Sequence, residues 1–322
     1  MSGQSSRIVV MGECMLELSG GLGGDTRLAY AGDTLNTALY LARAGLTPDY
    51  VTALGEDPYS AEIIEGWRAE GIGADHVLRH PTRVPGLYAI RTDDEGERHF
   101  YYWRENSAAR AFFQIEGQVA AVDHAAKADW LYFSGITLSI FDAAGRQRLK
   151  DIAASVKSRG GQVVFDPNYR ARGWSSAGEA REAIRQIADT FTLVLPTFDD
   201  DAALFGDASV LDCAHRWQKW GAARVLVKDG PRGCTIVEQA NTTMIPVEQI
   251  IRPKDTTGAG DSFNGSFLGQ LISGAPLEIA AIAGNRTAAT VIQHPGAIIP
   301  RAAMPDLSAE ALYAVHKSLS LT

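Results

Sequence analysis

The amino-acid sequence predicts an α/β protein in which helices cover both faces of a central, mostly parallel sheet. Short apolar runs that end at Gly, Pro, Asp or Asn are typical of buried strands, and five of them lie at residues 7–13, 129–135, 161–168, 191–197 and 223–230. Helix-like segments separate most of these runs and lie at 33–45, 58–71, 142–160 and 179–190. Strands that alternate with helices in this way form a parallel sheet between two helical layers.

One segment, residues 86–106, does not follow this alternation of strand and helix. Its apolar and polar residues alternate, and DDEG in its middle is a strong turn signal, so we predict a hairpin outside the parallel sheet. Together with residues 13–31 it would form a small antiparallel β-sheet lid, although an ordinary edge hairpin gives the same pattern. No repeat, low-complexity tract or Pro/Ser-rich linker divides the chain, so residues 1–322 are expected to form a single domain with this lid.

The composition argues against several classes of partner. The chain has 322 residues and a net charge of -8, which disfavours binding to nucleic acid or to a membrane surface, because such partners favour basic patches. Its three cysteines lie far apart, as reduced thiols do, and it has neither a CxxC nor an HExxH zinc motif. It lacks a signal-peptide pattern and an apolar run of about 18 residues, so we expect a cytoplasmic protein.

Polar residues at the ends of the predicted strands indicate where a ligand would bind. In open parallel sheets, ligands bind beyond the carboxyl ends of the strands. The residues at these ends are Asp166, Asn168, Thr197, Asp200, Lys228 and Gly230. They are therefore the first candidates for binding residues.

The stretch TTGAG, residues 256–260, precedes a helix-like segment with an apolar face at 261–273. Backbone N–H groups at a helix N-terminus have no helical partner, and glycines let the chain approach a ligand closely. The loop is therefore suited to bind a phosphate, or the negative charge that develops during a reaction. It is not a GxxxxGK[ST] phosphate loop, and it lacks the third glycine and the preceding strand of a dinucleotide fingerprint.

Asp261 stands at the mouth of the same predicted helix. A carboxylate beside an anion site has a chemical use if it accepts the proton of a substrate hydroxyl while that oxygen attacks phosphorus. The alternative is that Asp261 only caps the helix, which Asp does well. The adjacent glycine loop favours the catalytic interpretation.

Several motifs resemble those of the PfkB, or ribokinase-like, carbohydrate kinases. DTTGAGDSFNG at 255–265 resembles the family's C-terminal signature, and AGDTLNTALYLARAG at 31–45 with ALGEDPYS at 53–60 resembles its N-terminal signature. Within the family, the chain is most similar to the 2-keto-3-deoxygluconate kinases, in GLYAIRTDDEGER, YYWREN and LPTFDDDAALFG. The resemblance spans nearly the whole chain and implies a ribokinase-like fold, with a Rossmann-like sheet and a small β-lid.

The resemblance also implies roles for the residues at matching positions. Asp261 matches the catalytic base, and Gly258, Ala259 and Gly260 match the anion hole. Positions that bind the sugar or its keto-acid group are matched by Gly32, Asn36, Tyr88, Tyr102, Arg104 and Arg170. Positions that bind the nucleotide are matched by Asn168, Lys228, Gly230, Gly233, Thr257 and Asn285.

One motif departs from the family pattern. Many members carry an Asn-x-x-Glu motif that is linked to magnesium and phosphate, and Thr197 and Asp200 stand at these two positions here. Asp200 is therefore a candidate for an indirect contact with Mg²⁺. The sequence does not identify the residues that bind the metal directly. The resemblance implies ATP and Mg²⁺ as cofactors, with K⁺ as a candidate monovalent cation.

The resemblance implies an ATP-dependent sugar-acid kinase that assembles as a homo-oligomer. It would phosphorylate the terminal primary hydroxyl of 2-keto-3-deoxygluconate to give 2-keto-3-deoxy-6-phosphogluconate. A kinase for a neutral sugar (ribose, fructose) or for a nucleoside is the alternative, and Arg104 argues against it because a neutral sugar has no carboxylate for Arg to pair with. Asp261 argues against a non-catalytic sensor, and the missing fingerprint argues against an NAD-dependent oxidoreductase. The epimer preference stays open.

Overall fold

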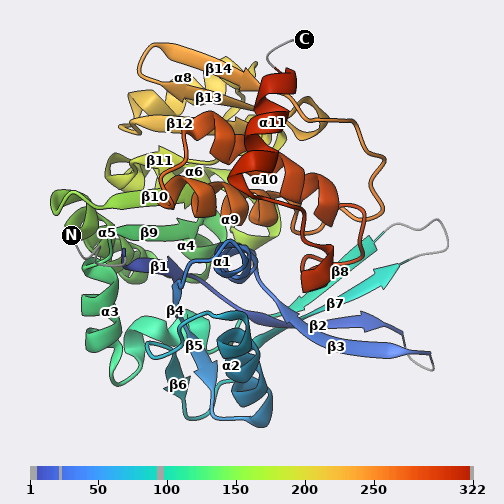
Figure 1. Cartoon of the computed structure of the whole chain (residues 1–322). Helices are drawn as coiled ribbons and strands as arrows, with labels where there is room; N and C mark the ends of the chain where they lie inside the picture. Colours follow the sequence, from blue (N-terminus) through green and yellow to red (C-terminus); the bar gives the residue numbers. More distant parts are fainter. Residues whose placement is uncertain (1–5, 22–23, 93–97, 320–322) are drawn as a thin grey trace, which may run out of the picture.

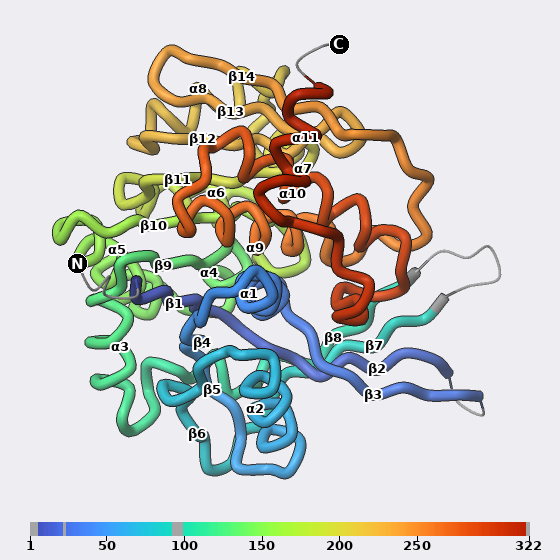
Figure 2. Tube along the Cα trace, viewed as in Figure 1, coloured from blue at the N-terminus to red at the C-terminus, as the bar shows by residue number. Residues whose placement is uncertain are grey.

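The central feature of the computed structural model, which describes residues 6–21, 24–92 and 98–319, is an eight-stranded sheet (Figures 1 and 2). The strand order is β14-β13-β12-β11-β10-β9-β1-β4. These strands are β1 (Ile8–Met11), β4 (Asp49–Val51), β9 (Trp130–Ser134), β10 (Gln162–Asp166), β11 (Leu193–Val194), β12 (Arg224–Lys228), β13 (Cys234–Glu238) and β14 (Asn241–Ile245). From β4 to β12 all neighbours are parallel, so the five strands predicted from the sequence are confirmed.

Helices cover both faces of this sheet, because each strand sends alternate apolar side chains to opposite sides. In β1, Val9 and Met11 belong to one core cluster, and Ile8 and Val10 belong to the other. The first cluster is closed by α3 (Gln118–Ala126), α4 (Gly135–Ile140), α5 (Ala143–Ser158), α6 (Ala177–Ile187), α7 (Phe198–Phe205) and α8 (Val210–Lys219). The second is closed by α1 (Asp33–Arg43), α2 (Pro58–Glu70), α9 (Ala259–Ile272), α10 (Leu277–Val291) and α11 (Ala309–Leu319).

The helix bounds follow the local capping chemistry. Asp57 accepts a hydrogen bond from the backbone of Ser60, Pro58 occupies the first turn of α2, and Gly71 ends the helix with a φ of 88°. Ser176 caps α6 in the same way through the backbone of Glu179. The four helices predicted from the sequence before residue 200 are thus confirmed as α1, α2, α5 and α6, with small shifts at their ends.

A second, four-stranded sheet lies outside the main one and extends from the body of the molecule (Figure 1). It contains β2 (Met15–Gly20), β3 (Thr26–Ala31), β7 (Gly86–Thr92) and β8 (Arg98–Trp103), in the order β3-β2-β7-β8. The predicted hairpin is confirmed as β7 and β8, and its DDEG turn lies outside the described residues. The expected antiparallel arrangement is wrong in one respect, because β2 and β7 are parallel and the sheet is therefore mixed. The chain reaches β7 only after α1, α2 and β6, and not through a hairpin from β2.

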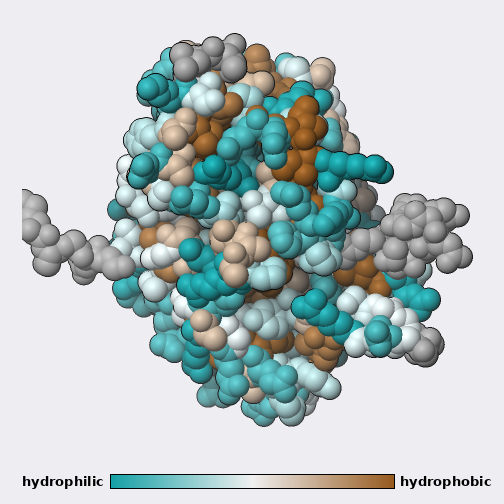
Figure 3. All heavy atoms as spheres, turned by 45° about the vertical axis from the view of Figure 1, so that its right-hand side comes forward, coloured by the Kyte–Doolittle hydropathy of each residue, from teal (hydrophilic) through white to brown (hydrophobic). Residues whose placement is uncertain are grey.

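Short strands complete the fold. β5 (Ala53–Gly55) pairs in parallel with β6 (Leu78–His80) beside α2. The face shown in Figure 3 carries mostly hydrophilic side chains, with apolar ones in small separate areas. None of the helices in the described part of the chain is long and apolar enough to cross a membrane.

Candidate active site

The glycine loop leads directly into α9, as the sequence predicts. Gly258 is the residue before the helix, with a φ of 73°, and a Cβ there would lie 2.5 Å from the Cβ of Ala297. Both the backbone conformation and the close packing therefore require glycine. The backbone N–H groups of Gly260 and Asp261 donate to no other described residue. They are free to bind negative charge at the positive end of the helix dipole.

Asp261 lies in the first turn of α9 and is buried. Its Oδ2 accepts a hydrogen bond of 2.8 Å from Nδ2 of Asn36, which lies on α1. The residue before the helix is Gly258, and no side chain caps α9. The capping interpretation of Asp261 is therefore wrong, and the carboxyl group faces α1 instead of the backbone of its own helix.

The electrostatic surroundings of Asp261 favour its protonated form. Burial, together with the nearby carboxylate of Asp33, raises the pKa of Asp261 to about 8, while the hydrogen bond from Asn36 acts in the opposite direction. Burial also raises the pKa of Asp33, whose Oδ2 lies 3.3 Å from Nδ2 of Asn168. A carboxyl group with a pKa near neutrality is suited to accept a proton and to return it.

Lys228, at the end of β12, brings a positive charge to the start of α9. Its Nζ lies 2.9 Å from Oδ2 of Asp166 and 3.1 Å from Oδ1 of Asn264, and a Cβ on Gly260 would lie 3.5 Å from it. Asp166 also accepts a hydrogen bond of 2.6 Å from Asn264. These buried partners fix the ammonium group beside the glycine loop, where a phosphate would meet it.

A cavity of about 550 Å³ opens on one side of the glycine loop. Its lining includes the polar side chains of Thr197 and Lys228, the glycine Gly260, and apolar residues that include Ile251, Ala289 and Ile292. The predicted nucleotide-binding residues that line it are Lys228, Gly230, Gly233 and Asn285. Asn168 and Thr257 are not among the lining residues. Asn168 donates to Asp33, and Thr257 donates through Oγ1 to Asp255 over 2.7 Å.

A second cavity, of about 1030 Å³, lies between the four-stranded sheet and the carboxyl end of β10. Of the predicted substrate-binding residues, Tyr102, Arg104 and Arg170 line it. Tyr88 is buried in the small sheet, where its hydroxyl donates to Glu17. Gly32 precedes α1, and a Cβ there would lie 2.2 Å from the backbone oxygen of Glu13. The structure thus gathers three of the six residues on the wall of one cavity.

The two predicted arginines on this wall, Arg104 and Arg170, are both paired with acids. Arg104 donates through Nη2 to Glu13, a carboxylate that is 2% exposed and also accepts from Ser107. Arg170 donates through Nη1 to Asp200 over 2.7 Å. The buried Nε of Arg104 has no hydrogen-bond partner among the described residues. Glu13 was not among the residues predicted to bind a ligand, although it is an acid at the end of a predicted buried strand, which was a usable signal.

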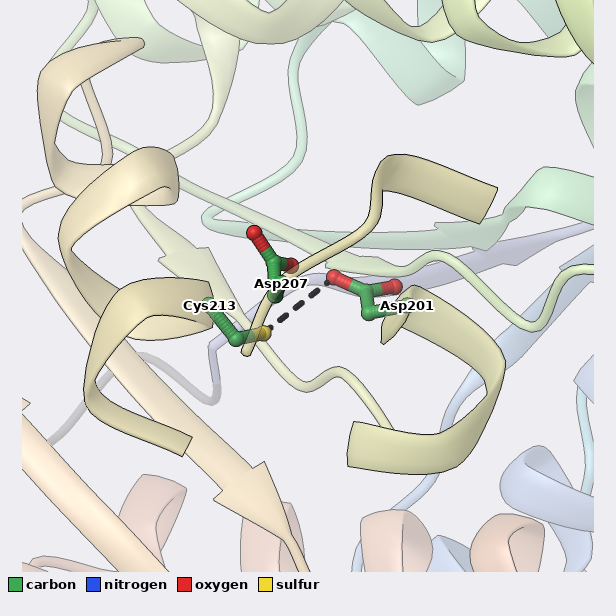
Figure 4. A group of neighbouring side chains, drawn as sticks. All are labelled: Asp201, Asp207 and Cys213. Atoms are coloured by element: carbon green, nitrogen blue, oxygen red, sulfur yellow. Dashed lines mark hydrogen bonds between the residues drawn. The ribbon is translucent and has the colours of Figure 1, made fainter. Parts of the chain in front are cut away.

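A separate cluster of Asp201, Asp207 and Cys213 has ligand atoms close enough for a metal ion (Figure 4). Arg216 already occupies this position with its positive charge. Its Nη2 lies 2.7 Å from Oδ2 of Asp201 and 2.6 Å from Oδ2 of Asp207. The rings of Phe205, Trp217 and Trp220 also surround its guanidinium group, at 3.9 to 4.8 Å. The cluster is therefore a buried ion pair and not a metal site.

Comparison with known proteins agrees with this arrangement of fold and site. Residues 5–304 match the family described as pfkB family carbohydrate kinase. The chain is 41% identical to the 2-dehydro-3-deoxygluconokinase of Escherichia coli strain K12 over 309 residues, which cover 94% of this chain and 99% of the relative. It is 39% identical to the enzyme of the same name from Dickeya dadantii over 312 residues, with the same coverage.

The ribokinase-like architecture is shared with solved structures. A double mutant of fructokinase from Vibrio cholerae O395, in a fructose, ADP and potassium ion bound form, superimposes with a TM-score of 0.82 at 23% identity. The match covers 98% of this chain and 99% of that one. The fold predicted from the sequence is therefore confirmed, and the chain belongs to the pfkB family of carbohydrate kinases.

Proposed function

We propose that this chain is a 2-dehydro-3-deoxygluconokinase, which transfers the γ-phosphoryl group of ATP to the terminal primary hydroxyl of 2-keto-3-deoxygluconate. The full-length relatives of that name support the activity. The observation that carries the choice of an acidic substrate is that two guanidinium groups, those of Arg104 and Arg170, line the same cavity. Guanidinium groups form charge-assisted hydrogen bonds with a carboxylate, which are worth about 1.5–3 kcal/mol each.

In this proposal Asp261 accepts the proton of the attacking hydroxyl. The hydroxyl oxygen forms a bond to the γ-phosphorus, the bond to the β,γ-bridging oxygen breaks, and ADP leaves with that oxygen. The N–H groups of Gly260 and Asp261 face the negative charge that develops on the phosphoryl group. Lys228, fixed by Asp166 and Asn264, would contact the phosphates beside Gly260.

The nucleotide and metal requirements follow from the family. Kinases of this family use ATP with Mg²⁺, and Mg²⁺ neutralises phosphate charge when it is bound. One oxygen of Asp200 accepts from Arg170, so its second oxygen fits a contact with Mg²⁺ through water. Three properties stay predictions: a requirement for K⁺, assembly as a homo-oligomer and a cytoplasmic location.

The first test is a coupled ADP-release assay over a panel of acceptors. We expect kcat/KM for 2-keto-3-deoxygluconate to exceed that for fructose, ribose and nucleosides by at least about 10-fold, because one charge-assisted hydrogen bond is worth that much. The epimer derived from galactonate belongs in the same panel. A preference for ribose or fructose would contradict the proposal.

Variants of the two paired arginines test how the acid is held. Removing Arg104 alone would leave Glu13 buried without its cation, so the informative variant is Glu13→Gln combined with Arg104→Gln. We expect this double variant, and separately Arg170→Ala, to raise KM for the keto-acid by about 10- to 100-fold. Activity on fructose should change much less, and Glu13→Gln alone is the matched control for folding. Equal losses on acidic and neutral acceptors would reject this role.

The four-stranded sheet is proposed to act as a lid over the substrate. Phosphoryl transfer wastes ATP if water reaches the γ-phosphate, so the site should close when the acceptor binds. Hydrogen exchange of the backbone amides of β7 and β8 should slow when substrate is added, while the hairpin of β13 and β14 should serve as an unchanged reference. If β7 and β8 exchange equally fast with and without substrate, they form only an edge hairpin.

A further inference from the structure

Two of the arginines that line the cavity between the four-stranded sheet and the end of β10 are neutralised by neighbouring acids. Arg104 is paired with Glu13, and Arg170 is paired with Asp200. Each pair has almost no net charge, although both guanidinium groups still offer N–H donors to a ligand. An anionic substrate that entered this cavity would therefore need a further, uncompensated positive charge to offset its own loss of hydration.

Arg110 provides a charge of this kind. It lies in the 3-10 helix Ala109–Gln114, a few residues after the end of β8, and it lines the same cavity as Arg104 and Arg170. It is half-buried, and within the described part of the chain it forms no ion pair and no side-chain hydrogen bond. The nearby acid on this wall, Glu105, is exposed and accepts from the backbone of Arg104. A half-buried guanidinium group that lines a cavity and has no protein acceptor is available to pair with an anionic ligand.

Arg172 lines the same cavity but is a weaker candidate. It is exposed, and its Nη1 donates to the backbone oxygen of Phe100 over 2.9 Å. Water already solvates an exposed cation, and salt screens its interaction with a distant anion. Arg172 is therefore a matched control for Arg110. It is the same residue type on the same cavity, but its guanidinium group is exposed and already donates a hydrogen bond to the backbone.

We propose that Arg110 binds the carboxylate of the acidic sugar and supplies the net positive charge that distinguishes it from a neutral sugar. In this arrangement the N–H groups of Arg104 and Arg170 orient the acid, and Arg110 supplies the charge. The inference rests on the proposed function, because it assigns a further specificity residue to the same acceptor site.

The experiment compares Arg110→Gln, Arg110→Lys and Arg172→Gln with the wild type, using 2-keto-3-deoxygluconate and fructose as acceptors. We expect Arg110→Gln to raise KM for the keto-acid at least about 10-fold, with a change of less than about threefold on fructose. Arg110→Lys should recover part of the loss, because it keeps the charge but not the planar fork. Arg172→Gln should change neither acceptor by more than about threefold. Activity on fructose and the melting temperature report whether each variant is folded.

Ionic strength gives an independent readout of the same charge. In the wild type, kcat/KM for the keto-acid should fall as NaCl is added, and this dependence should be weaker in Arg110→Gln. An unchanged KM for the keto-acid in Arg110→Gln, or an equal effect of Arg172→Gln, would overturn the assignment of Arg110 and leave the proposed function intact. A wild type that used fructose and not the keto-acid would instead overturn the proposed function, and the assignment with it.

Discussion

Replacement of Asp261 by Asn is expected to reduce kcat by about 10²-fold or more while KM for the sugar changes little. Asn has nearly the same shape but does not accept the proton of the attacking hydroxyl. In the wild type, kcat/KM should rise as the pH increases through about 8, because burial holds the pKa of Asp261 there and only the ionised form acts as a base. Near-normal turnover in the folded variant would show that Asp261 is not the base.

The same variant should be more stable than the wild type. The folded-state pKa of Asp261 is raised to about 8 from an ordinary value of 3.8, so the folded wild type binds a proton that the unfolded chain releases. The stability of the wild type therefore decreases as the pH rises from about 4 to about 8, and the Asp261→Asn variant has no such loss. We expect the advantage of the variant in melting temperature to widen over this range and to level off above it. A stability difference that does not vary with pH would show that the buried carboxyl is ionised at all these values.

Replacement of Arg216 by Met is expected to reduce the free energy of unfolding by about 3–5 kcal/mol, without a direct effect on the site. The change leaves Asp201, which is fully buried, and Asp207 without the cation that both contact. Met keeps most of the apolar contact with the aromatic rings, so the loss reflects the charge. Urea-induced unfolding measures it, and Arg68→Met is the control, since the ion pair of Arg68 with Asp75 is exposed and worth less than about 1 kcal/mol.

The pH dependence of this variant identifies the cause of its instability. Burial already raises the pKa of Asp201 to about 6 while Arg216 lowers it, so removal of Arg216 should raise it further. The deficit of Arg216→Met should then be smaller at pH 5 than at pH 8, because a protonated Asp201 costs little in the core. A deficit that is equal at both values would indicate lost packing and not an unpaired carboxylate.

Much of the fold could be predicted because its elements carry local signals. The parallel strands are continuous apolar runs of β-branched and aromatic residues, and the helices between them begin and end at recognisable caps such as Asp57 and Gly71. The hairpin of β13 and β14 was missed because most of β14 is exposed and its residues do not alternate clearly. The pairing of β2 with β7 was also beyond local signals, since these strands are separated by two helices in the chain.

The sequence by itself determined the chemical parts of this protein: a glycine loop that needs a positive φ at Gly258, an acid three residues later, and the signatures that place the chain in its family. These follow from short-range constraints on the backbone and from residue type. Only the tertiary structure decided the protonation state of Asp261 and the net charge around the arginines of the substrate cavity. Asn36 and Asp33 come from α1 to set the pKa of Asp261. Glu13 and Asp200 neutralise the two expected arginines, and Arg110 has no ion-pair partner among the described residues. Electrostatic energies depend on distance and burial, and residues far apart in the chain fix both.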